Sequence, residues 1–178
     1  MIRGGIFSLG QVHGSAFLSG IIVRAVRLQA MHEPIPGSSE LWSRISAVLI
    51  AMSSGIQDSD DVIGNACADA LSIALSFEGL DAPTLDERLL DSVGLILLNL
   101  SKAMQQYDSG NTADVLRIMK LTKASGICLG SSARATGIVR HRVDCVNALF
   151  GLLGSNAFRQ NEELGLLVGE AVAQYSDS

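Results

Sequence analysis

The sequence predicts an all-helical fold, and three observations support this. Apolar residues recur at helical spacing along almost the whole chain, no segment alternates apolar and polar residues for long, and turn-forming residues gather between the helical segments. Of the 178 residues, 48% are hydrophobic and 17% are charged, and the mean hydropathy is +0.34. This much apolar surface can offset the entropy cost of folding, so intrinsic disorder is excluded.

The first expected helices cover residues 2–14 and 17–31, before the clearest linker of the chain. This linker contains Pro34 and Pro36, and neither proline fits the interior of a helix. The next helix is expected at 38–54. Its apolar stripe consists of Leu41, Trp42, Ile45, Val48, Leu49 and Met52.

Two further helices begin at residues that suit a helix start. Asp58 and Asp61 place carboxylates at an N-terminus, where the helix dipole favours negative charge. Thr84 and Glu87 have the spacing of a capping box, in which each side chain accepts a backbone hydrogen bond. The two helices are expected at 60–77 and 85–106.

The last three helices differ in regularity. The first of them begins beside Asn111 and Asp114, and Lys120 and Lys123 interrupt one side of its apolar stripe. The other two carry regular apolar stripes. The three helices are expected at 112–130, 137–154 and 160–175, and almost no strand is expected.

The helices group into consecutive pairs of about 40 to 45 residues, which is the period of HEAT and armadillo repeats. The second helix of each pair is rich in Ala, Gly and Ser, and residues 65–71 can be aligned with 123–129, which places Ala66 on Ala124 and Leu71 on Leu129. We therefore expect an α-α superhelix, a HEAT- or armadillo-like solenoid, as one helical-repeat region over 1–178; an ordinary α-helical bundle is the alternative. The pairs are expected at 38–77, 85–130 and 137–175, preceded by helices within 2–31.

Glycines inside the expected helices need a packing role, because each costs about 1 kcal/mol relative to alanine. Small residues let stacked helices approach closely, so Gly126 and Gly169 are expected at helix contacts. On this reasoning, Leu71→Asp and Gly169→Leu should both unfold the chain. Helices reach both ends of the sequence without a polar capping repeat, so an uncapped fragment of a longer array is expected.

Charge and composition limit the classes of partner that this chain is expected to bind. The formal net charge is −5, and the chain has only five Phe, two Tyr and one Trp. Nucleic-acid binding needs basic surface and often stacking aromatics, so nucleic acid is not expected as a partner. No apolar run reaches the roughly eighteen residues of a membrane span, and the N-terminus lacks a signal-peptide core. Membrane insertion is therefore not expected, and the expected location is the cytoplasm or nucleus.

No arrangement of residues predicts a catalytic, cofactor or metal site. His13, His32 and His141 each lack a carboxylate or cysteine at a spacing that would orient the ring as a base. The three cysteines lack zinc-ligand spacing and suit small apolar positions in a reducing compartment. The glycine-rich stretches match no phosphate-binding loop. The remaining alternative of this kind is a compact all-α enzyme or ligand-binding bundle that uses His13, His141 or a cysteine.

One basic cluster is a candidate for binding a protein partner. It consists of Arg134, Arg140 and Arg142, between and within the last helices. In a helical-repeat protein, charged loops and helix ends are common contact points for partners. We therefore expect these arginines to contribute to partner binding.

Three segments resemble, in the same order, helices of the large HEAT-repeat proteasome adaptor and scaffold proteins. In the most distinctive segment, Glu163 and Leu164 are followed by the run Val168-Gly169-Glu170-Ala171, as in the family's "E-L-Q-F-x-I-G-E-A" helix. The sequence departs from the family at Arg3, where a histidine is usual, and at Ser72, where a glycine is usual. The matching segments are 4–10, 65–71 and 149–171.

This resemblance implies a non-enzymatic adaptor that binds and stabilises the proteasome, with proteasome subunits as protein partners. The family offers no catalytic residue to transfer to this chain. Another HEAT-type scaffold, such as a nuclear-transport or assembly factor, remains an alternative because it shares the architecture and differs only in its partner.

Overall fold

The computed structural model describes residues 9–32, 35, 38–58, 60–76, 87–106, 112–133, 135–154 and 161–176. These residues form seven α-helices and two short 3-10 helices, with no strand among them. The all-helical prediction is therefore confirmed. The elements are α1 (Leu9–His32), α2 (Ser38–Gly55), α3 (Asp61–Leu75), η1 (Glu87–Leu89), α4 (Leu90–Gln105), α5 (Thr112–Ser131), η2 (Thr136–Ile138), α6 (Val139–Leu153) and α8 (Glu162–Ser176).

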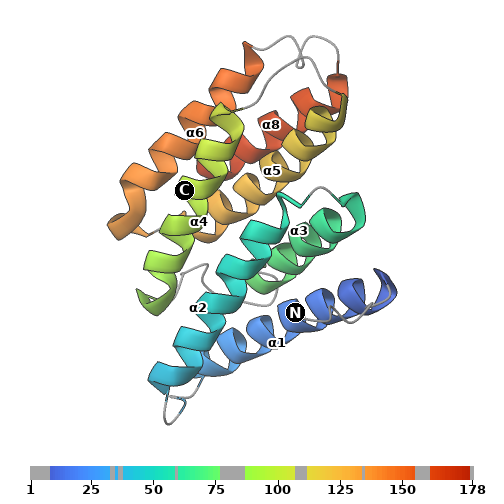
Figure 1. Ribbon diagram of the computed structural model, residues 1–178. Coiled ribbons are helices and arrows are strands. Elements are labelled where there is room, and N and C mark those ends of the chain that lie inside the picture. Colours follow the sequence, from blue (N-terminus) through green and yellow to red (C-terminus); the bar gives the residue numbers. More distant parts are fainter. Residues whose placement is uncertain are drawn as a thin grey trace.

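The helices lie in two rows (Figure 1). One row contains α1, α3, α5 and α8, each packed on the next, and the other contains α2, α4 and α6. Contacts between the rows join α2 to α3, α4 to α5 and α6 to α8. Consecutive helices therefore pack as pairs, and like members of successive pairs stack on each other.

The N-terminal helix differs from the prediction. Two helices were expected at 2–14 and 17–31, whereas α1 runs without a break from Leu9 to His32. A single glycine costs a helix only about 1 kcal/mol, so Gly14 does not end it. Most of the family-like segment 4–10 lies outside the described residues.

Carboxylate caps start α3, with a small shift from the expected residues. Asp60 is the N-cap, and its Oδ1 accepts the backbone N–H of Val62 at 2.8 Å. Asp58 accepts the N–H of Asp60 at 2.8 Å, which fixes the approach to the helix. Asp61 is therefore left available for a tertiary contact. The other expected starts, at Thr84 and Asn111, lie outside the described residues.

The core lies between the two rows and is dominated by leucine. Leu71, as expected, is fully buried, and it belongs to the same hydrophobic cluster as the other fully buried leucines. Trp42 on α2 is also buried, and the guanidinium carbon of Arg88 in η1 lies 4.3 Å from the centroid of its ring. This contact joins the first helix pair to the second. The largest fully buried side chains are Leu49, Ile56, Leu71, Leu75, Leu89, Ile96, Leu97, Leu100, Ile118, Leu121, Leu129 and Leu149.

Glycines bring helices of the same row close together, but not all of the expected ones do so. A Cβ at Gly20 would lie 2.6 Å from the carbonyl oxygen of Ala70, and one at Gly126 would lie 3.0 Å from Cα of Ala171. Gly169 is exposed, and a Cβ there would have no atom within 4 Å. The expectation that Gly169→Leu unfolds the chain is therefore wrong, because Gly169 lies on the outer side of α8.

Gly20→Ala and Gly169→Ala should change stability in opposite directions. The first places a methyl group against backbone and should lower the free energy of unfolding by about 1–3 kcal/mol. The second removes a helix glycine into open space and should raise it by about 1 kcal/mol. Urea unfolding followed by circular dichroism measures both. A stabilised Gly20→Ala variant would contradict the close approach of α1 and α3.

Candidate protein-binding groove

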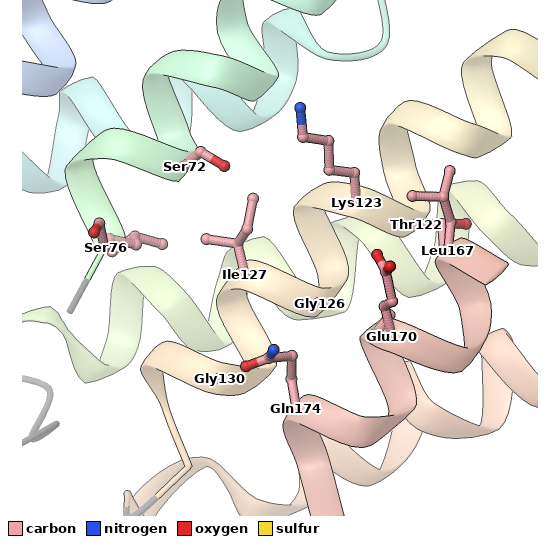
Figure 2. Close-up of a pocket in the computed structure, with 12 residues that line it drawn as sticks. Ser72, Ser76, Thr122, Lys123, Gly126, Ile127, Gly130, Leu167, Glu170 and Gln174 are labelled. Carbon is pink, nitrogen blue, oxygen red and sulfur yellow. The ribbon is translucent and has the colours of Figure 1, made fainter. Parts of the chain in front are cut away.

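Two adjoining hollows are lined by residues of α3, α5 and α8, and together we call them the groove. Their volumes are about 330 and 360 Å³, and both are lined by Lys123 and Leu167. Figure 2 shows the first hollow, where Glu170 and Gln174 on α8 face α5. The further lining residues used below are Asp61, Asp69, Leu116, Thr122, Ile127 and Glu163.

Ion pairs between α3 and α5 form one side of the groove. Lys120, only 8% exposed, donates to Oδ1 of Asp61 at 2.5 Å, and Lys123 donates to Oδ1 of Asp69 at 3.1 Å. The Lys123 pair is exposed and adds little stability, whereas the buried Lys120 needs its partner. The two lysines that interrupt the apolar stripe of α5 therefore neutralise carboxylates of α3. Sequence reasoning found the lysines and missed Asp61 and Asp69 as their partners.

The α8 side of the groove carries negative charge. Glu163, Leu167 and Glu170 follow one another at helical spacing on one face of α8, and all three line the groove. Among the described residues, neither Glu163 nor Glu170 forms an ion pair, whereas Lys120 and Lys123 are already paired with α3. The groove therefore combines an apolar strip, formed by Leu116, Ile127 and Leu167, with two carboxylates that form no ion pair within the described part of the chain, and the lysines that share the groove are paired with α3.

A buried hydroxyl also lines the first hollow. Thr122 is fully buried, and its Oγ1 has no hydrogen-bond partner among the described residues. A buried polar group without a partner costs about 1–3 kcal/mol. Because Thr122 is fully buried, this cost is a cost of folding, and a molecule in the groove does not contact the hydroxyl.

The structure describes two of the three arginines that were expected to contribute to partner binding, and it places these two differently. Arg134 lies outside the described residues, and Arg140 is exposed in the first turn of α6. Arg142 is 6% exposed, and its Nη1 donates to the carbonyl oxygen of Ala133 at 2.6 Å. Its guanidinium carbon lies 5.0 Å from the ring centroid of Tyr175, and burial lowers its pKa. Arg142 thus holds the α5–α6 connection against α8, and of the two described arginines Arg140 is the one whose side chain is exposed.

Arg142→Ala and Arg140→Ala should therefore differ in their effect on folding. Arg142→Ala removes a charged hydrogen bond and buried packing, so the free energy of unfolding should fall by about 1–3 kcal/mol. Arg140→Ala changes an exposed side chain and should stay within about 0.5 kcal/mol of the wild type. Thermal unfolding gives the melting temperature of each variant. Equal melting temperatures would contradict the buried position of Arg142.

The histidines and cysteines lie in packed or undescribed positions. The side chains of His13 and His32 lie outside the described residues, and His141 packs against Gly94. Cys128 on α5 and Cys145 on α6 are both buried free thiols. Burial raises the pKa of Cys145 to about 11 and that of Cys128 further, so both stay thiols, the less reactive form. In the described part of the chain, no three His, Cys, Asp or Glu side chains are placed to hold a metal ion.

The raised thiol pKa values predict a loss of stability in alkaline solution. Below an ordinary thiol pKa of 9.0, the cysteines are protonated in both the folded and the unfolded chain. From 9.0 to about 11, the unfolded Cys145 releases its proton while the folded one retains it, so the free energy of unfolding falls as the pH rises. Urea unfolding at several alkaline pH values should show a smaller fall for a Cys128→Ala, Cys145→Ala double variant. Parallel curves for the two proteins would contradict the burial of these thiols.

Comparisons with known proteins do not assign this chain to a family. Within the described ranges, no helix combines the length and the apolar character that crossing a membrane requires. Searches against protein-family models, curated proteins and solved structures find no match to this chain. The likeness to the proteasome adaptor family therefore rests on the sequence segments alone.

Proposed function

We propose that this protein is a non-enzymatic scaffold that binds a segment of another protein in the groove. The observation that carries the proposal is the combination of an apolar strip with Glu163 and Glu170, which have no cation partner among the described residues. The groove is open to solvent along three helices, which suits a chain segment better than a small enclosed ligand. Binding there needs no bond chemistry, only complementary surface.

The charges of the groove determine which kind of protein segment we expect it to bind. Glu163 and Glu170 are seven residues apart, which is about 10 Å along α8. A segment that carries two Lys or Arg residues at that separation, with an apolar residue between them, would pair with both carboxylates and cover Leu167. The proposed partner segment is therefore basic and amphipathic.

We further propose proteasome subunits as the proteins that carry this segment, and the cytoplasm or nucleus as the place of binding. The support is the resemblance of 163–171 to the adaptor family, because this stretch supplies Glu163, Leu167 and Glu170 to the groove. The two-row helical packing suits a HEAT-like superhelix, which we propose as the architecture. A nuclear-transport or assembly-factor scaffold would use the same groove with a different partner.

Reversing the groove charges should weaken partner binding without unfolding the chain. A Glu163→Lys, Glu170→Lys variant places two cations where the proposed partner brings its own, so binding should weaken at least about tenfold. Binding of purified proteasomes to the immobilised chain, measured by biolayer interferometry, compares this variant with the wild type. Glu87→Lys, Asp91→Lys is the matched control, since it makes the same charge change at exposed positions away from the groove.

The outcomes separate the two parts of the proposal. Equal proteasome binding by the wild type and the groove variant would contradict the groove as the binding site. If the wild type does not bind proteasomes at all, the proteasome assignment is wrong. The groove is then tested by affinity capture and mass spectrometry, in which proteins retained by the wild type and the control should be absent with the groove variant.

A further inference from the structure

The groove runs along the three helices that form it. One of its hollows is lined by residues early in each helix, and the other by residues later in each helix. The early ranges are 61–69, 116–123 and 163–167, and the later ranges are 72–76, 122–130 and 167–174. Because the order is the same on all three, α3, α5 and α8 run in the same direction. The part of α5 that lines the groove, 116–130, is about 21 Å long.

α5 forms the floor of the groove, and α3 and α8 form its walls. Both walls pack on α5, whereas in the described part of the chain no comparable packing joins α3 to α8. Figure 2 shows α5 between Ser72 of α3 and Gln174 of α8. Gly126 and Gly130 add no side chain to the floor there. Packed helices lie about 8–10 Å apart, so the axes of the two walls lie up to about 20 Å apart, and a helix with its side chains is about 10–12 Å wide. The space over α5 therefore suits one further helix.

The backbone of the groove cannot support an extended segment. Within α3, α5 and α8 the N–H and C=O groups pair with one another, so the groove offers no sheet edge to which a strand could be added. An extended segment on the apolar strip of Leu116, Ile127 and Leu167 would bury peptide groups of its own, and each one left without a partner costs about 1–3 kcal/mol. A helix pairs these groups within itself. The groove therefore favours a helical segment.

The carboxylates of α8 have the spacing of two helical turns. Glu163 and Glu170 are seven residues apart, and Leu167 lies between them on the same face. A helix alongside α8 presents two Lys or Arg residues at this spacing of about 10 Å when they too are seven residues apart. Apolar residues three and four positions after the first of them lie between the charges, on the side that faces the apolar strip. An extended polyproline II segment instead reaches this spacing with charges three residues apart.

We propose that the segment bound in the groove is an amphipathic α-helix of about 14 residues that lies along α5, between α3 and α8. The side of this helix that faces the groove carries two Lys or Arg residues seven positions apart, which pair with Glu163 and Glu170. Apolar residues between them cover Leu167. This inference rests on the proposed function, because it specifies the conformation of the segment that the groove binds.

Three synthetic peptides of equal length, about 14 residues, test the conformation of the bound segment. The helical probe has two lysines seven residues apart, leucines three and four positions after the first lysine, and alanine and glutamine elsewhere. The extended probe has the same composition, with its lysines three residues apart. The proline probe is the helical probe with proline in place of a central alanine on the side away from the lysines, which interrupts a helix. Each peptide carries a fluorescent label, and fluorescence anisotropy gives its dissociation constant with the purified chain.

The helical probe should bind the wild type at least about tenfold more tightly than the extended probe or the proline probe. The Glu163→Lys, Glu170→Lys variant should bind the helical probe at least about tenfold more weakly than the wild type, and the Glu87→Lys, Asp91→Lys control should bind it as the wild type does. A helical probe with glutamates in place of its lysines should bind the groove variant and not the wild type, because the ion pairs then form with their signs exchanged. Circular dichroism verifies that both variants keep the fold.

Two kinds of contrary result have different meanings. If the extended probe binds the wild type more tightly than the helical probe, or the proline probe binds equally well, the bound segment is not a helix, and the groove remains the binding site. If none of the probes binds the wild type, or the groove variant binds the helical probe as tightly as the wild type does, the groove itself is wrong. The second kind of result overturns the proposed function together with the helical conformation.

Discussion

The distance between neighbouring helices of the longer row controls the rest of the structure. Where a glycine faces an alanine, as at Gly20 and Ala70 or Gly126 and Ala171, the two backbones meet closely. Between α3 and α5, Lys120 instead reaches across to a carboxylate. The groove lies beside this ion pair. The same row therefore has two steps joined by close glycine–alanine contacts and one step, between α3 and α5, joined by ion pairs.

Helical periodicity predicts most of this fold because each helix buries one stripe of apolar residues, and burial alone produces that spacing. It fails at Gly14, since a single glycine weakens a helix without ending it. It also fails wherever the outcome depends on packing between distant segments. The sequence cannot show that Asp61 faces Lys120, that Arg142 turns inward to Ala133, or that Gly169 lies on the outside. The groove was missed for this reason, because its charges come from three helices.

α8 divides its fifteen residues between the core and the surface. Leu164 and Val168 are buried in the core. On the surface, Glu163 and Glu170 line the groove, and Leu166 is exposed beside them, three residues after the first and four before the second. The effect of a substitution in α8 therefore depends on which of these sides it alters.

The single tryptophan of the chain lies at the junction between the first two helix pairs. Its ring is buried under Arg88, so its emission responds to the contact between α2 and η1 and hardly to events near α8. In stacked repeats, each unit touches only its neighbours, and different parts of the array can open independently. Tryptophan fluorescence therefore reports whether the contact between α2 and η1 is intact, whereas circular dichroism averages over all the helices. The separation between the two transitions is a direct readout of how cooperatively the array unfolds.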